Sequence, residues 1–219
     1  MNSKSFRITG SDVFAAFQVF MAYYFAVPQV RQMFVSVQGV TINWLLCAMI
    51  FIGLNLFLSI GSYRKVPSRS TLQALVIYAN WIVLLVPMVI ITFVKCTWTR
   101  QDSFIFILIM ASAIAVVIWG KWNERSLADP IIRGLLVGLF RVVPHLFMAY
   151  CIFHAGSGHG VATKTVIAAN ITALARIVTL YLSGRKSQWK EKGVRAMLLA
   201  ESANEASWMF TTIMWYIYR

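Results

Sequence analysis

The sequence has little charge, few acidic residues and little cysteine. Charged residues make up 12% of the 219-residue chain, and only seven residues are Asp or Glu, whereas soluble domains usually carry about 25% charged residues. The three cysteines (Cys47, Cys96 and Cys151) are odd in number and lack the spacing of metal ligands. Neither a disulfide framework nor a metal site is therefore expected. A soluble domain, which needs a polar surface on all sides, is excluded as well.

Long apolar runs dominate the chain, and hydrophobic residues make up 59% of it. A membrane-spanning helix needs about 20 mainly apolar residues. Seven stretches qualify, namely Asp12–Val30, Val40–Tyr63, Thr71–Lys95, Ser103–Gly120, Pro130–Phe153, Val161–Gly184 and Ala196–Tyr218. The polar tail before them, residues 1–10, lacks the cleavage site of a signal peptide, and the connections are too short for a soluble domain. The sequence therefore predicts an all-α membrane protein with seven transmembrane helices in a lipid bilayer.

The formal net charge of +13 is large enough for a nucleic-acid-binding protein, but the basic residues are not distributed as in such a protein. Lys and Arg form short clusters between the apolar stretches and no continuous basic face, so no nucleic-acid partner is expected. With seven spans, the side of the N-terminus carries thirteen Lys and Arg and the opposite side five. By the positive-inside rule, we expect a cytoplasmic N-terminus and an outside C-terminus. The expected location is a bacterial inner (cytoplasmic) membrane.

The two halves of the chain carry similar residues in the same order, which indicates an internal repeat. The first half contains Pro28-Gln29, Gly39-Val40, Gly61 and Asn80, and the second half contains Pro144-His145, Gly160-Val161, Gly184 and Asn204. Both halves would enter the membrane from the same side, which makes them parallel repeats. The expected units are a first triple-helix bundle over 11–96, a linker helix and loop over 97–129, and a second triple-helix bundle over 130–219.

On these residues the chain resembles the PQ-loop or SWEET superfamily, which includes sugar SWEETs, bacterial SemiSWEETs, cystinosin-like exporters and PnuC-type vitamin transporters. The resemblance is carried by Pro28-Gln29 with Gly39-Val40-Thr41, and by Pro144-His145 with Gly160-Val161. It implies a three-plus-one-plus-three helix arrangement over nearly the whole chain. It also implies hinge roles for Pro28 and Pro144 and substrate contacts by Asn80 and Asn204.

Each of these implied roles has a structural alternative. Proline is common in membrane helices without acting as a hinge, and asparagine often forms hydrogen bonds between such helices. Three departures from the family pattern count against a sugar as the substrate. His145 stands in place of the second glutamine, the sixth span has no Trp or Phe to stack on a sugar ring, and the expected orientation is opposite to that of plant and animal sugar SWEETs.

Charged residues inside the last three spans form a second group of candidate site residues. Glu201 and Glu205 are four residues apart on one helix, so they share a face, and Asn204 lies beside them. Arg141 and Arg176 in neighbouring spans are the expected partners. The group either binds a charged solute, with Glu205 as the main proton-coupling candidate and Glu201 the shallower one, or forms a structural ion-pair cluster. Because the first half lacks such charges, a zwitterion or an anion fits the site better than a neutral sugar.

The sequence thus predicts a transporter that moves a small polar solute (an amino acid, a carboxylate or a sugar) by alternating access between the two bundles. No cofactor is expected, and no catalytic residues are identified, so the chain is not expected to be an enzyme. Two other classes remain as alternatives: a membrane receptor or sorting protein on the same fold, and an integral membrane enzyme. Two bundles in one chain make a monomer sufficient, and a homo-oligomer remains open.

Overall fold

The computed structural model describes residues 9–96, 98–187 and 192–219, and these residues are helical with short connections and no strand. The helices are α1 (Gly10–Val35), α2 (Ile42–Lys65), α3 (Arg69–Lys95), α4 (Arg100–Trp122), α5 (Pro130–Val137), the π-helical segment η1 (Gly138–Val142), α6 (Val143–Ala155), α7 (Thr163–Ser187) and α8 (Lys192–Ile217). The predicted all-α class is confirmed for this part of the chain. Residues 1–8 of the predicted polar tail lie outside the described residues.

Local capping residues explain where several helices begin. The side chains of Thr41, Ser68 and Thr99 accept hydrogen bonds from backbone N–H groups in the first turns of α2, α3 and α4. Asp129 accepts a hydrogen bond from the backbone N–H of Ile131 at the start of α5, and proline occupies the first position of that helix. Such residues satisfy N–H groups that have no partner inside the helix, so each apolar run has a defined start.

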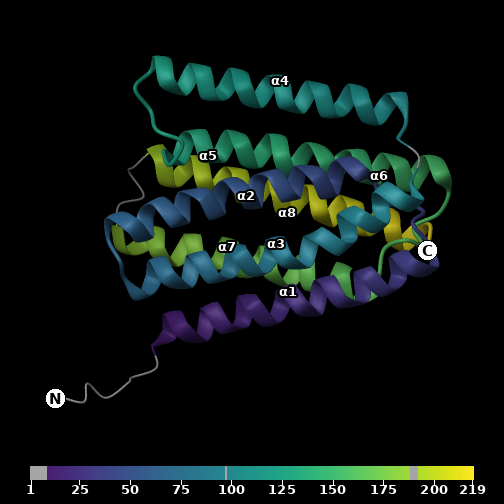
Figure 1. The fold of residues 1–219 in the computed structure, drawn as a ribbon, viewed down its shortest axis with the longest axis horizontal. Coiled ribbons are helices and arrows are strands. Elements are labelled where there is room, and N and C mark those ends of the chain that lie inside the picture. Colours follow the sequence, from purple (N-terminus) through teal and green to yellow (C-terminus); the bar gives the residue numbers. More distant parts are fainter. Residues whose placement is uncertain (1–8, 97, 188–191) are drawn as a thin grey trace.

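The long helices run side by side along the longest axis of the molecule, and α1 begins and α8 ends at opposite ends of it (Figure 1). In the first group, α1–α3, helix α3 packs between α1 and α2. In the second group, α5–α8, helix α8 packs between the α5–α6 segment and α7. The two groups meet where α1 packs on α7 and α2 packs on η1 and α6. The third helix of each group is therefore the central one.

Helix α4 lies at one edge of the molecule, where it contacts α5, η1 and α2 (Figure 1). Its attachment near its N-terminal end is polar: the amide nitrogen of Asn43 donates to the backbone carbonyl of Asp102 over 3.0 Å and to its carboxylate over 3.3 Å. Both residues are buried. The opposite face of α4 presents large apolar side chains, with Phe104 67% and Ile107 65% exposed, which is the pattern expected of a helix beside lipid.

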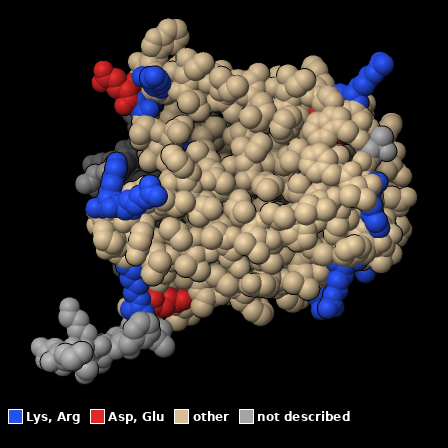
Figure 2. Space-filling model, in the orientation of Figure 1, with Lys and Arg blue, Asp and Glu red and all other residues tan. Residues whose placement is uncertain are grey.

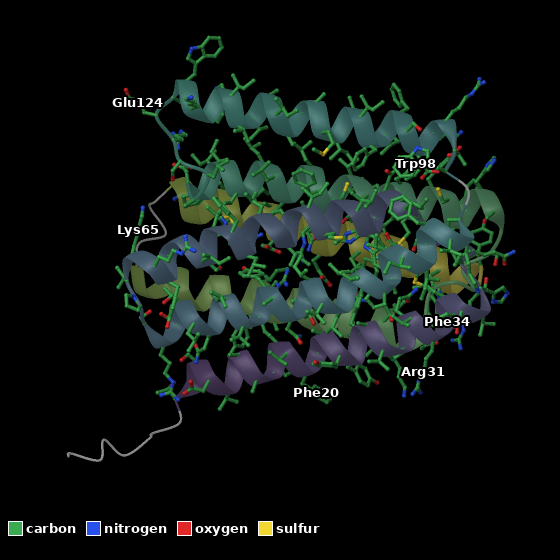
Figure 3. The ribbon with its side chains drawn as sticks, in the orientation of Figure 1. Phe20, Arg31, Phe34, Lys65, Trp98 and Glu124 are labelled. Atoms are coloured by element: carbon green, nitrogen blue, oxygen red, sulfur yellow. The ribbon has the colours of Figure 1, made fainter. Side chains whose placement is uncertain are left out.

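Five described segments are long and apolar enough to cross a membrane: α1, α2, α3, α4 and the continuous α5–α6 segment. Helices α7 and α8 are of similar length and carry more polar residues. On the face in view, Lys and Arg gather at the two ends of the molecule, and a broad band without them lies between (Figure 2). Phe20 of α1 points outward within this band (Figure 3) and is 62% exposed. These features are consistent with an integral membrane protein.

Two details differ from the sequence-based expectation. Helix α1 continues through Pro28 to Val35, five residues beyond the predicted end at Val30, because a single lost backbone hydrogen bond does not end a helix that is packed on both sides. The fifth span was predicted over Pro130–Phe153 with a hinge at Pro144, and it contains the π-helical segment η1, which was not predicted, immediately before α6, whose first turn holds Pro144. A π-helical turn contains an extra residue and interrupts the regular α-helical hydrogen bonds. Proline, which has no backbone N–H, therefore follows a point where that pattern is already broken.

Candidate functional site

A cavity of about 310 Å³ lies between the two groups and is lined by side chains from both of them. Helices α1, α2 and α3 contribute one wall, and α5–α8 contribute the other. The volume is at the lower end of the range of pockets that bind small molecules. Helix α4 contributes no lining residue. The cavity is the candidate functional site.

Aromatic rings from five segments form one end of the cavity, which we call the aromatic floor: Phe25, Trp44, Trp81, His145 and Trp208. Trp44 of α2 stacks on Trp208 of α8, with ring centroids 5.9 Å apart, and thereby joins the two groups. Phe25 packs against Trp44 at 6.2 Å and against Trp81 at 5.5 Å. His145 packs edge-on against Trp208 at 4.7 Å. The floor offers flat apolar surfaces to a bound molecule.

Beyond the aromatic floor, two loops close the cavity at the end where α2 begins, and we call residues 36–41 and 156–162 the loop seal. The backbone N–H of Gly160 donates to the carbonyl of Gln38 over 2.7 Å. The hydroxyl of Ser157 donates to the Gln38 side chain over 2.9 Å. An added Cβ atom at Gly160 would lie 2.6 Å from the Gln38 carbonyl oxygen. The loops therefore touch backbone to backbone.

The side chain of Gln29 in α1 forms two hydrogen bonds with the loop seal. Its side chain is fully buried. The amide nitrogen donates to the carbonyl of Gly160 over 2.8 Å, and the amide oxygen accepts from the backbone N–H of Ala162 over 3.0 Å. The glutamine of the Pro28-Gln29 pair thus connects the first group to the second. His145, its counterpart in the repeat, bonds instead within its own group, to the Ser207 hydroxyl at 3.3 Å.

The cavity extends from the aromatic floor in the direction away from the loop seal. Its lining there includes Phe14, Gln18, Arg133 and Met197. Each of these residues lies within the first three turns of α1, α5 or α8, and these helices begin at the end of the molecule opposite the seal (Figure 1). The cavity therefore reaches toward one end of the molecule and is closed at the other.

Among the described residues, three arginines and one glutamate line the cavity. Arg141 Nη1 lies 3.6 Å from Glu201 Oε2, and the guanidinium of Arg141 also lies over the ring of Phe51 at 5.5 Å. Arg133 donates to the side-chain oxygen of Asn55 over 2.8 Å. Arg176 is half-buried and forms no salt bridge with a described residue. The cavity lining therefore carries more positive than negative charge.

Several buried polar atoms on the cavity lining have no hydrogen-bond partner among the described residues. The donors are Arg141 Nη1 and Trp208 Nε1, and the acceptors are Glu201 Oε2 and Asn204 Oδ1. Leaving such an atom buried without a partner costs about 1–3 kcal/mol, so native proteins satisfy nearly all of them. Their concentration on one cavity indicates a site that binds a polar molecule.

The structure brings some of the predicted site residues together and separates others. Arg141, Arg176 and Asn204 line the cavity. Asn80 and Glu205 do not line it, although the Asn80 amide nitrogen and Glu205 Oε2 are buried without a hydrogen-bond partner among the described residues. The predicted hinge residues differ in setting. Pro28 lies inside the continuous helix α1, and Pro144 follows a π-helical segment.

Sequence reasoning missed three parts of the site. Glu201, interpreted as shallow, lines the cavity, whereas Glu205 was favoured as the functional carboxylate. Arg133 was counted only among the charges of one membrane side. The aromatic floor was not expected because the sixth span has no Trp or Phe, yet its rings come from the other spans. The repeat pairs Trp81 with Trp208 by their places after Asn80 and Asn204, but it gave no role to either ring, and Trp44 has no aromatic counterpart in the other half.

A comparison with known protein families, curated proteins and solved structures found no match to this chain. The fold and the site define a class: an all-helical protein with long apolar helices of the kind that span membranes, and with an internal cavity between two groups of helices that is lined by aromatic and charged side chains. The likeness to the PQ-loop superfamily rests on the residues of the chain itself.

Proposed function

We propose that the protein is a transporter of small polar solutes with a SWEET-like arrangement of seven transmembrane helices. In this proposal the first group is one triple-helix bundle, α4 is the linker, and the second group is the other bundle. Two observations support it: the third helix is the central one in both groups, and the contacts between groups pair the first helix of one with the second of the other. Parallel repeats related by an axis along the membrane normal have this pattern.

The observation that carries the transport proposal is a cavity between the two groups that is closed at one end. Alternating access requires that this end open while the other closes. Pro28 and the Pro144 region would flex to allow it, because a helix is weakest where a backbone hydrogen bond is missing. With the N-terminus in the cytoplasm of a bacterium, the closed end faces outward and the cavity reaches toward the cytoplasm.

The direct test is solute flux in liposomes that contain the purified protein. Vesicles preloaded with an unlabelled amino acid, carboxylate or sugar should accumulate the same labelled solute by exchange, and empty vesicles should not. Tight binding without flux would contradict transport and favour a receptor. A chemically altered solute would instead indicate an enzyme.

Gln29→Leu is expected to open the loop seal, because it removes two hydrogen bonds between the groups. Each is worth about 1 kcal/mol, so the loss of about 2 kcal/mol should make the seal open about thirtyfold more often. The measurement is labelling of Ala169→Cys, which lies in the cavity lining, in a protein whose native cysteines are replaced. A membrane-impermeant thiol reagent added on the seal side should react faster when Gln29 is leucine.

The control for this experiment is Gln101→Leu, an exposed position on α4, which should leave the labelling rate unchanged. Equal rates in the Gln29 and Gln101 variants would show that the glutamine does not hold the seal closed.

A further inference from the structure

We infer that the solute is an organic anion with a flat apolar part: its anionic group binds the arginines of the cavity, and its flat part lies on the aromatic floor. This inference rests on the proposed function only for the movement of the solute across the membrane. Binding of the anion follows from the cavity itself.

The first argument is the charge of the cavity. Arg133, Arg141 and Arg176 line it, and Glu201 is the only carboxylate that lines it among the residues that the structure describes. Glu201 lies near Arg141, which leaves Arg176 without a salt bridge to any described residue. Cations held away from water are unfavourable unless an opposite charge lies nearby. An anionic solute would supply that charge, whereas a cationic solute would add to the repulsion.

The second argument is the set of buried donors without a hydrogen bond. Trp208 Nε1 has no hydrogen-bond partner in the described part of the chain, and Arg141 Nη1 has none either, since its ion-pair partner Glu201 Oε2 lies 3.6 Å away. Both residues line the cavity, as does Arg176. Arginine suits carboxylate and other planar oxyanions because its N–H groups can donate two parallel hydrogen bonds. The anionic group is therefore expected near these three residues.

The third argument is the aromatic floor. Trp44 and Trp208 stack on each other, and Phe25 and Trp81 extend the same surface. A small inorganic anion would gain nothing from this apolar surface, whereas a planar organic group would pack against it. The acceptors Glu201 Oε2 and Asn204 Oδ1 accept no hydrogen bond from a described residue, so they can receive one from a hydroxyl or amino group of the same solute.

The test uses compounds that share a phenyl ring and differ in charge. The probes are phenylacetate (anion), phenylalanine (zwitterion), 2-phenylethanol (neutral) and phenethylamine (cation), with acetate as an anion without a ring. Binding to the purified full-length protein in detergent is measured by calorimetry. Phenylacetate should bind most tightly and phenylalanine next. The affinity of the other three should be lower by about tenfold or more, because each lacks either a charged hydrogen bond to arginine or the burial of a ring.

Arg176→Gln is the decisive variant, because Arg176 has no salt bridge in the described structure whose loss would unfold the protein. It should weaken phenylacetate binding by about tenfold or more and leave 2-phenylethanol binding unchanged. Arg176→Lys keeps the charge and should retain most of the affinity. Arg31→Gln is the matched control, because it removes a positive charge from an exposed side chain that points away from the helices (Figure 3), and its affinities should equal those of the wild type.

Three results would overturn the inference: no binding of phenylacetate, equal or tighter binding of 2-phenylethanol or phenethylamine, or no effect of Arg176→Gln on phenylacetate. The unfolding midpoint of each variant without ligand shows whether it is folded, and Arg176→Met, which also removes the charge, serves if glutamine unfolds the protein. Phenylacetate binding without flux in liposomes would leave the anion site standing and contradict the transporter. Flux of a neutral or cationic solute, without anion binding, would support the transporter and overturn the anion site.

Discussion

Glu201→Gln is expected to destabilise the protein by about 3 kcal/mol, the cost of breaking a buried ion pair by removing one partner. Within the described part of the chain, the glutamate is the only carboxylate that lines the cavity, and its side chain is 10% exposed. Without it, Arg133, Arg141 and Arg176 share the cavity with no opposite charge from any described lining residue. The unfolding midpoint of the purified protein in detergent should fall clearly below that of the wild type.

Two further variants show whether charge is the cause. Glu124→Gln removes a carboxylate that is exposed at one end of α4 (Figure 3), and it should change the stability by less than about 0.5 kcal/mol. The double variant Glu201→Gln with Arg141→Gln should recover part of the loss, because the uncompensated guanidinium is gone. If the single Glu201 variant is as stable as the wild type, the carboxylate does not compensate the positive charge of the arginines in the cavity.

The helices could be predicted from the sequence because their signals are local. Long apolar runs specify spans, and residues such as Thr41, Ser68 and Asp129 mark their starts. The π-helical segment before Pro144 could not be predicted in the same way. It depends on how the α5–α6 segment packs against α2, α4 and α8, which are distant contacts that no short stretch of sequence encodes.

Part of the candidate site could be predicted from the sequence. The sequence did not show how α8 is rotated about its own axis, and this rotation decides which of its side chains face the cavity. Glu201 and Glu205 were assigned to one face, but a helix turns by about 100° per residue. Asn204 and Trp208 therefore lie to one side of Glu201 and line the cavity with it, whereas Glu205 lies to the other side and does not. A spacing of four residues places two side chains near each other without showing which of them faces a cavity.

The charges that line the cavity also differ from the expected group of two glutamates and two arginines. Arg141 pairs with Glu201, and among the described residues Arg133 lines the cavity whereas Glu205 does not. The excess of positive charge, which carries the inference of an anionic solute, becomes visible only when the lining residues are known.

Gly160→Ala is the second change with a large expected effect. The new Cβ atom would lie 2.6 Å from both the carbonyl oxygen of Gln38 and the carbonyl carbon of Val37. These are backbone atoms, which cannot rotate away, so the two loops of the seal must separate. The expected cost is about 1–3 kcal/mol, as for other overpacked sites. Hydrogen exchange of the backbone amides of residues 156–162 should become faster, and the unfolding midpoint should fall.

Gly53→Ala is the matched control, because an added Cβ atom there has no neighbour within 4 Å. Gly53 lies in the middle of α2, where alanine favours the helix by up to about 1 kcal/mol, so this variant should be as stable as the wild type or more so. Similar behaviour of the two alanine variants would show that the loops are not in close contact.

Gly39 makes a close contact of the same kind as Gly160. The tight approach of the two loops is therefore a feature of both halves of the repeat. Gly39 and Gly160 hold corresponding places in the two halves. The φ angle of Gly39 is +80°, and a Cβ atom there would lie 2.8 Å from Cγ1 of Ile152 and 3.0 Å from the carbonyl oxygen of Ser157. Each glycine thus lets its own loop approach the other half of the molecule. If the protein is a transporter, these two contacts close the outer end, and a side chain at either glycine should shift the protein toward an outward-open state.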